Sequence, residues 1–305
     1  MSNYLNIKEV SRSYGSIKAV DKFSLVVPSE KITALVGPDG AGKTTLMRMV
    51  CNLIDLDSGE ISIDGMNIAG QFDKIKPILG YMPQVFSLYP DLSVEENLKF
   101  YAGIFDVTGI AFGHKVEELY RFSNLKPFKD RRALALSGGM KQKLALSCAL
   151  MHDPKILLLD EPTTGVDPLS RRQFWEILLN LRNNGVTILV STPYMDEVAR
   201  ADNACFIFDG KKLIEGRPDD LPSIFEGKLF YLDKEPTSTL VKRINSIEGI
   251  IARRFGAGLH LLLNQDDKIE NYFDKLRFVE IVPEQIKPIK ADLEDCFIQL
   301  MEHHP

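Results

Sequence analysis

The run Gly37-Pro38-Asp39-Gly40-Ala41-Gly42-Lys43-Thr44-Thr45 fits the P-loop pattern G-x-x-x-x-G-K-[ST]. In this pattern backbone N–H groups and the positive end of a helix surround phosphate groups, and the lysine reaches the outermost phosphates. The run follows the apolar segment Lys31–Val36 and opens a predicted helix over Thr44–Ile54. Because a P-loop needs a strand before it and a helix after it, this context favours a phosphate site over a structural glycine-rich turn.

A pair of carboxylates follows a second apolar run. Asp160 and Glu161 come directly after Ile156–Leu159, which is apolar throughout, as is Thr187–Val190 further along. Continuous runs of this kind are typical of strands buried in a parallel sheet. Ligands bind at the carboxyl ends of such strands, so the pair is placed beside the phosphate loop. Without the P-loop, the same pair would be interpreted as the solvated end of a strand.

A third motif is Leu136-Ser137-Gly138-Gly139-Met140, here called the signature segment. Ser137 is a good helix N-cap, and the glycines expose backbone N–H groups at the start of the helix. A second anion site on one chain makes sense if it completes the phosphate site of another chain. The alternative is a capped surface helix with no ligand.

Together these motifs resemble those of the ATP-binding subunits of ABC transporters, and most closely those of ABC-2-type drug exporters. The resemblance spans residues 14 to 197 and weakens after residue 227, although Glu294-Asp295-Cys296-Phe297 resembles the ending of that group. It implies an α/β fold, the P-loop NTPase fold of an ABC-type nucleotide-binding domain with a helical subdomain, plus a small α+β C-terminal domain. The implied cofactors are ATP and Mg²⁺.

The resemblance also implies roles for single residues. Thr44, Gln84 and Asp160 would hold the metal, while Glu161, assisted by Gln84, would polarise the attacking water. Gly165-Val166-Asp167 resembles a loop that crosses the dimer interface beside the other ATP. The residues expected to contact ATP are Tyr14 (stacked on adenine), Gly37, Pro38, Asp39, Gly40, Ala41, Gly42, Lys43, Thr44 and Thr45, with Ser137, Gly138 and Gly139 contacting the ATP of the opposite subunit.

Two residues depart from the family pattern. Asp39 puts a carboxylate near phosphates, which is unfavourable unless it points away or pairs with a cation. Pro193 follows Val190-Ser191-Thr192, where relatives usually have a histidine that contacts the γ-phosphate. Proline offers neither a side-chain donor nor a backbone N–H. Either the chain is the catalytically weak half of an unequal ATPase pair, or it is a slow homodimer that relies on Glu161.

Two domains are expected, residues 1–222 as the nucleotide-binding domain and residues 227–305 as the accessory α+β domain. The first begins with antiparallel strands near 4–10 and 22–28, and its middle, 93–151, is mostly helical with a capping box at Ser93. Trp175, on one face of a helix, is expected in the core. The second domain has a βαββαβ-like order ending in a helix over Asp292–Met301.

The composition limits the classes of function. The chain has 305 residues and a net charge of −5, which argues against a nucleic-acid-binding surface. No stretch approaches the roughly 20 apolar residues that span a bilayer, and the start MSNYLNIKEV lacks the pattern of a secretory signal. Four widely spaced cysteines (Cys51, Cys148, Cys205, Cys296) indicate reduced cytosolic thiols.

The expected function is ATP binding and hydrolysis that powers a separate ABC-2-type membrane permease, in export of drugs or other small molecules. Two chains, identical or different, would form the ATPase, on the cytoplasmic face of the inner membrane. The apolar run Val85-Phe86-Ser87-Leu88-Tyr89 either docks on the permease or folds into the core. The alternatives are a non-transport ABC ATPase acting on ribosomes or DNA, and a nucleotide sensor without turnover.

Overall fold

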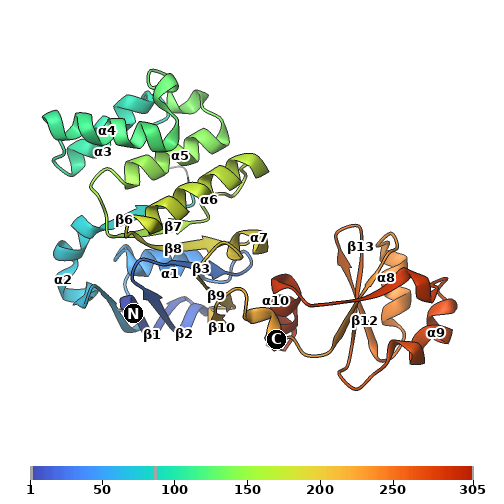
Figure 1. Cartoon of the computed structure of the whole chain (residues 1–305). Helices are drawn as coiled ribbons and strands as arrows, with labels where there is room; N and C mark the ends of the chain where they lie inside the picture. The colour runs from blue at the N-terminus through green and yellow to red at the C-terminus, as the bar shows by residue number, and fades with distance from the viewer. Residues whose placement is uncertain (1–2, 86–87, 304–305) are drawn as a thin grey trace. The chain divides into compact units, whose positions relative to one another are not determined.

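The computed structural model describes residues 3–85 and 88–303. They form two compact units, Met1–Pro218 and Asp219–Pro305 (Figure 1). The division after Pro218 falls a few residues before residues 223–226, which separate the two expected domains. The short helix η4 (Leu221–Ile224) belongs to the second unit, where the Cys296 thiol donates a hydrogen bond of 3.4 Å to the carbonyl of Leu221. No helix among the described residues is long and apolar enough to cross a membrane.

A six-stranded sheet forms the centre of the first unit, in the order β10-β9-β3-β8-β7-β6. The five strands from β9 to β6 are parallel, and β10 pairs antiparallel with β9. As the apolar runs predicted, β7 and β8 are buried along their whole length and lie side by side. The strands are β3 (Ile32–Val36), β6 (Leu79–Met82), β7 (Ile156–Asp160), β8 (Thr187–Thr192), β9 (Asn203–Phe208) and β10 (Lys211–Gly216).

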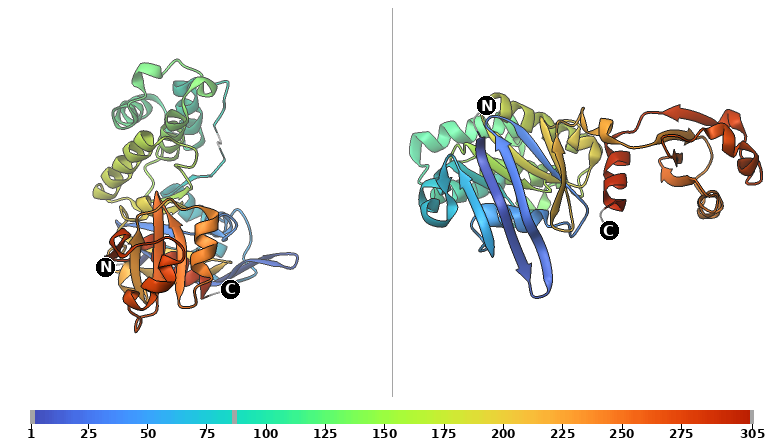
Figure 2. Two further views of the ribbon diagram at one scale, coloured as in Figure 1. Left: turned by 90° about the vertical axis from the view of Figure 1, so that its right-hand side faces the viewer. Right: turned by 90° about the horizontal axis from the view of Figure 1, so that it is seen from below.

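A second sheet of four antiparallel strands, β2-β1-β4-β5, is built on one long hairpin (Figure 2). Its strands are β1 (Asn3–Tyr14), β2 (Ile17–Pro28), β4 (Ser58–Ile63) and β5 (Met66–Asn67). The hairpin exceeds the predicted 4–10 and 22–28 because its register shifts at several points, including residues Glu9 and Lys22 with positive φ. Such bulges interrupt the alternation on which the prediction depended.

Helix α1 (Lys43–Val50) lies in the core between the two sheets. Its Leu46, Met47 and Val50 share one buried cluster with residues of β1 and β2 and with Leu158 of β7. The helix is shorter than the predicted Thr44–Ile54, since Asn52 adopts a left-handed conformation with φ of 52°. The cluster holds the start of α1, and with it the phosphate loop, against the central sheet.

Helices cover the other face of the central sheet. Figure 1 shows α5 (Gly138–Ala149) and α6 (Pro168–Asn183) next to the sheet, with α3 (Val94–Ile104) and α4 (Gly109–Ser123) beyond them. The capping box at Ser93 is present, and Trp175 is buried in the core, both as predicted. The remaining helical segments are α2 (Ile68–Ile75), η1 (Lys76–Ile78), η2 (Lys126–Phe128), η3 (Ala133–Ala135) and α7 (Met195–Val198).

The second unit has its own antiparallel sheet, ordered β12-β13-β11-β14. Helices α8 and α9 bury one face around Leu261 of β13. The neighbouring His260 points to the opposite face, where its Nδ1 lies 2.7 Å from Asp295 Oδ1 of α10. The segments are β11 (Lys228–Leu232), α8 (Ser238–Asn245), β12 (Ile250–Phe255), β13 (Gly258–Leu263), η5 (Ile269–Tyr272), α9 (Phe273–Arg277), η6 (Pro283–Gln285), β14 (Ile286–Ile289) and α10 (Leu293–Glu302).

Candidate functional site

The phosphate loop connects β3 to α1 at the carboxyl end of the central sheet. Gly42, the N-cap of α1, has φ of 103°, and a Cβ added there would lie 2.3 Å from the carbonyl oxygen of Ala19. Only glycine therefore allows the loop to turn into the helix at this point. A cavity of about 270 Å³ opens over the loop. Its lining consists of Ala19, Asp39, Gly40, Gly42, Lys43, Thr44, Thr45, Gln84 and Glu161.

Lys43 and Glu161 meet across this cavity. The Lys43 ammonium lies 2.9 Å from Glu161 Oε1 and donates hydrogen bonds of 2.8 and 3.0 Å to the carbonyls of Gly37 and Pro38. Both side chains are almost fully buried. Glu161 Oε2 accepts from Gln84 Nε2 at 2.9 Å and from the Thr164 hydroxyl at 3.2 Å. Its carboxylate is thus held in one direction by donors from three separate segments.

The backbone at Glu161 is unusual for a residue other than glycine. Its φ is 48°, in the left-handed region that bulky residues rarely adopt. The strain is offset by β8, because Ser191 Oγ accepts a hydrogen bond of 2.9 Å from the Glu161 N–H. The same hydroxyl donates to Asp160 Oδ1 at 2.8 Å. Ser191 therefore orders both acidic residues, a role that the sequence did not suggest.

Asp160 has the properties of a metal ligand that works together with phosphates. It is fully buried, and its Oδ2 accepts no hydrogen bond from the residues that the structure describes. Burial raises the pKa of this carboxyl, while the neighbouring Ser191 and Thr44 hydroxyls oppose the rise. Mg²⁺ commonly takes only one or two protein ligands and completes its shell with water and phosphate oxygens. Asp160 and Thr44 fit that requirement.

Gln84 begins a segment that is partly exposed. Val85 and Tyr89 have exposed fractions of 74% and 46%, whereas Leu88 is buried. Phe86 and Ser87 of the predicted docking run lie outside the described residues. The Tyr89 ring meets Phe100 of α3 edge-on, with ring centroids 4.5 Å apart, and Phe100 and Ile104 on α3 are also exposed. Within this run, the exposed Val85 and Tyr89 fit the interpretation as a docking surface, and the buried Leu88 fits the interpretation as core.

The other predicted ATP contacts lie apart from the cavity. Tyr14 is exposed at the tip of the β1–β2 hairpin, with the Arg12 guanidinium 5.3 Å from its ring centre. Ser137 caps α5 by accepting a hydrogen bond of 3.4 Å from the Met140 N–H. A Cβ on Gly139 would lie 2.6 Å from Ser170, so this glycine also allows α5 to approach α6. Tyr14, Ser137 and Gly139 are not among the described residues that line the cavity.

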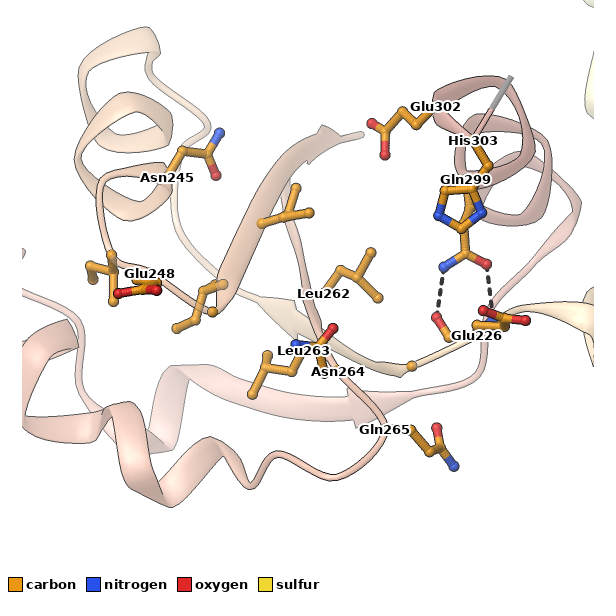
Figure 3. A pocket seen from close by; sticks show the side chains of 15 residues that line it. Glu226, Asn245, Glu248, Leu262, Leu263, Asn264, Gln265, Gln299, Glu302 and His303 are labelled. Atoms are coloured by element: carbon orange, nitrogen blue, oxygen red, sulfur yellow. Dashed lines mark hydrogen bonds between the residues drawn. The ribbon is translucent and has the colours of Figure 1, made fainter. Parts of the chain in front are cut away.

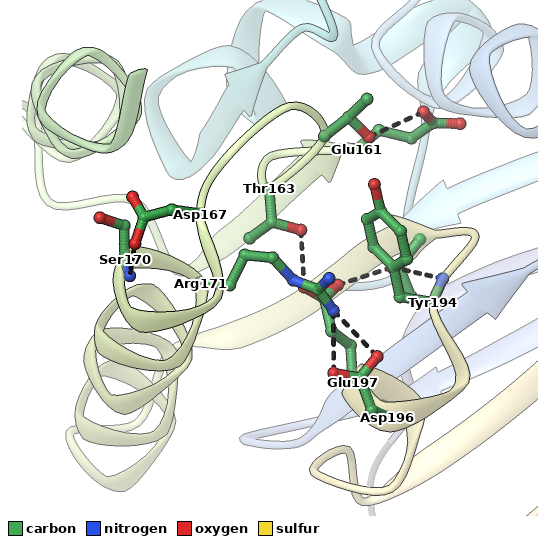
Figure 4. Close-up of polar contacts among 10 residues, drawn as sticks. Glu161, Thr163, Asp167, Ser170, Arg171, Tyr194, Asp196 and Glu197 are labelled. Carbon is green, nitrogen blue, oxygen red and sulfur yellow. Dashed lines mark hydrogen bonds and ion pairs between the residues drawn. The ribbon is translucent and has the colours of Figure 1, made fainter. Parts of the chain in front are cut away.

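A buried polar network behind Glu161 was not predicted from the sequence (Figure 4). Glu197 of α7 accepts hydrogen bonds from Thr163 Oγ1 at 2.7 Å and Thr192 Oγ1 at 2.6 Å. Its third donor is Arg171 Nε of α6, at 3.1 Å. No sequence pattern indicated that Arg171 would pair with Asp196 and Glu197.

The second unit holds a larger cavity of about 520 Å³ (Figure 3). Glu226, Glu248 and Glu302 lie around it, and Gln299 bonds the backbone of Glu226 through both ends of its amide. The described residues include no group of three or more histidine, cysteine or acidic side chains placed to hold a metal ion. The lining residues of this cavity all belong to the second unit.

Comparison with known proteins points to one family. A sequence profile described as "ABC transporter" matches residues 20–164. The probable multidrug ABC transporter ATP-binding protein YbhF of Escherichia coli (strain K12) is 40% identical over 93% of this chain and 49% of its own length. The chain thus spans about half the length of the YbhF proteins that it matches.

Two further proteins are matched over most of their own length. The Nod factor export ATP-binding protein I of Cupriavidus metallidurans is 37% identical over 72% of this chain and 73% of its own length. A dimeric structure of MJ0796, a bacterial ABC transporter cassette, is 25% identical, with a TM-score of 0.64 over 70% of this chain and 98% of that one. The fold of this chain therefore agrees with that of the cassette.

Proposed function

Since this chain belongs to the ATP-binding proteins of ABC transporters, we propose that it binds and hydrolyses MgATP to drive a separate membrane permease. The observation that carries the proposal is the convergence of Lys43, Gln84 and Glu161 on one cavity at the phosphate loop. A cation for phosphate, a carboxylate for water and an amide that donates to this carboxylate come from three different segments of the chain.

The site residues divide the work between binding and proton transfer. The loop N–H groups and Lys43 hold the phosphates, and Tyr14 stacks on the adenine. Thr44 and Asp160 hold Mg²⁺, which when bound neutralises charge on the transferred phosphoryl group. Glu161 accepts a proton from the attacking water, and Gln84 orients that water. Asp39 is exposed and lines the cavity, so its carboxylate would have to turn away from the phosphates or pair with a cation when ATP binds.

A second chain completes the site. The Ser137–Gly139 segment presents N–H groups at the start of α5 but lies away from the cavity of its own chain. We infer that it contacts the ATP of a second subunit, as the resemblance to a dimeric cassette supports. Because Pro193 offers no donor, a pairing with an unequal ATPase subunit is favoured over a homodimer.

The partner in the membrane is proposed to be an ABC-2-type permease on whose cytoplasmic side the chain docks. The exposed apolar side chains of Val85, Tyr89, Phe100 and Ile104 would form the contact. Export of drugs or other small molecules is supported by relatives named for multidrug transport and Nod factor export. Residues 227–305 serve as an accessory domain.

Steady-state ATP hydrolysis, measured over a range of protein concentrations with Glu161→Gln as the blank, tests the proposal. A rate that rises cooperatively with concentration and vanishes in the variant identifies a competent homodimer and rules out the unequal pair. A rate equal to the blank, with ATP still bound, means that a complementary subunit is needed. If hydrolysis stays at the blank level even beside the permease and its second ATPase, the chain is a nucleotide sensor, an alternative that Pro193 supports and the intact Glu161 opposes.

A further inference from the structure

The residues that follow β8 begin between two parts of the site, the phosphate loop and Glu161. In the sheet, β8 lies between β3 and β7, with Thr192 level with Val36 and Ser191 level with Asp160. The phosphate loop follows β3 and Glu161 follows β7. Residues 193 and 194 therefore start between these two groups, at the carboxyl end of the sheet where ligands bind. Pro193 contributes no donor there.

Tyr194 is the first side chain after β8 that carries a donor. Its ring lies against the Arg171 guanidinium, whose carbon is 3.9 Å from the ring centre, and its N–H donates to Thr192 Oγ1 at 3.1 Å. Figure 4 shows the hydroxyl end of Tyr194 directed toward the side of Glu161. A phenol hydroxyl both donates and accepts hydrogen bonds, as one tautomer of an imidazole does with its two nitrogens.

Arg171 is itself held in place by its other partners. Its Nη2 donates to both Asp196 oxygens, each at 2.9 Å, and its Nε donates to the buried Glu197 at 3.1 Å. Glu197 is bonded in turn to Thr163, in the loop that follows Glu161. The planar guanidinium is thus a fixed platform, tied to the same loop as Glu161, on which the Tyr194 ring rests.

We propose that the Tyr194 hydroxyl supplies the hydrogen-bond donor for ATP hydrolysis at the end of β8, where Pro193 supplies none, and that Arg171 is its positioning residue. This inference rests on the proposed function. A donor aimed at charge that develops on the transferred phosphoryl group accelerates the reaction without tightening substrate binding. The hydroxyl therefore affects kcat and leaves ATP affinity almost unchanged.

The test compares MgATP hydrolysis by the wild type and by Tyr194→Phe under conditions where the Glu161→Gln blank is silent. The phenylalanine keeps the ring on Arg171 and removes only the hydroxyl. We expect kcat to fall about 10- to 100-fold, with ATP dissociation constants within about a factor of two. Tyr231→Phe, which removes a hydroxyl from the second unit, is the matched control and should hydrolyse ATP as the wild type does. An unchanged kcat in Tyr194→Phe overturns the inference.

A second background separates the donor role from a general loss of structure. In Pro193→His the imidazole offers its own donor, so removing the Tyr194 hydroxyl should cost at most a few-fold there. An equal loss in both backgrounds would show that the hydroxyl acts elsewhere. Arg171→Lys keeps a positive charge but loses the planar stack. Arg171→Lys should lower kcat and leave ATP affinity almost unchanged. Combined with Tyr194→Phe, it should cause no further loss of kcat. An additive loss of kcat would show that Arg171 does not position Tyr194.

The outcomes also separate this inference from the proposed function. If the wild type equals the Glu161→Gln blank at every concentration and beside its partners, hydrolysis itself is absent and both proposals fail. If the wild type hydrolyses ATP and Tyr194→Phe does so equally well, only the role of Tyr194 fails.

Discussion

At the scale of single residues, Asp160 combines a cost in stability with a functional position. The carboxylate is fully buried, and desolvation raises its pKa above the value expected in the unfolded chain. Between those two pKa values the folded state binds more protons than the unfolded state does, so stability falls as the pH rises through this window. The whole of this unfavourable contribution is present at pH values above both pKa values.

Asp160→Asn should therefore unfold at a higher temperature than the wild type at pH 7 in the presence of a chelator. We expect an increase of about 2–6 °C, because the amide carries no charge to desolvate and still accepts from Ser191. The difference should shrink as the pH falls through the raised pKa of Asp160, because protonation removes the buried charge. ATP hydrolysis should be lost in the same variant. An unchanged or lower melting temperature at pH 7 would show that the buried charge is compensated.

The sequence predicted those site residues whose chemistry follows from a local pattern. Lys43 and Glu161 stand in short motifs and both line the cavity over the phosphate loop, and Asp160 is the last residue of β7. Ser191 and Thr164, which hold Glu161 in place, could not be predicted in this way. Hydroxyl side chains are common, and their partners are fixed only when β7 and β8 pair.

At the scale of elements, the two serine-capped helices differ in what their caps do. Ser93 forms a complete capping box with Glu96 at the start of α3, with bonds of 2.7 and 3.2 Å. Ser137 caps α5 through a single long bond of 3.4 Å. The first arrangement is typical of a stabilising cap. In the second, the hydroxyl contributes less to the helix and is available for a ligand.

Replacing the two serines by alanine should separate these roles. Ser93→Ala is expected to lower the free energy of unfolding by about 1 kcal/mol, the usual effect of a lost N-cap, with hydrolysis by the folded protein unchanged. Ser137→Ala should cost less stability but reduce hydrolysis by roughly tenfold or more, because it removes a donor to the opposite ATP. Denaturant unfolding and steady-state hydrolysis measure the two effects. Equal losses of hydrolysis in both variants would contradict the assignment of Ser137.

Elements were predicted best where one physical constraint determines the sequence pattern. Strands β7 and β8 are buried along their whole length, because both faces of the central sheet are covered, and they contain the runs Ile156–Leu159 and Thr187–Val190 from which they were predicted. The β1–β2 hairpin was predicted too short, since bulges interrupt the alternation of its strands. The link from α6 to α7 through Arg171 and Glu197 left no periodic signal at all.

At the scale of the whole molecule, each of the two units has a hydrophobic core of its own among the described residues. The core of the first unit joins α1 with both of its sheets, and the core of the second unit lies between its sheet β12-β13-β11-β14 and helices α8 and α9. The change in sequence character near residue 227 indicated the second unit. Its cavity, in contrast, could not be predicted, because its lining comes from segments between Glu226 and His303 with no common motif.

Two cores predict two unfolding transitions in differential scanning calorimetry, only one of which depends on nucleotide. In the Glu161→Gln protein, which retains its ATP, MgATP at 100 times its dissociation constant should stabilise the first unit by about 2.7 kcal/mol. That stabilisation raises the melting temperature of this unit by roughly 5–10 °C. Leu261→Ala, in the core of the second unit, should instead lower the other transition, because it leaves a cavity where a fully buried side chain packed. A single transition would show that the two units unfold together. A shift of both transitions with MgATP would show that nucleotide binding is transmitted to the accessory domain.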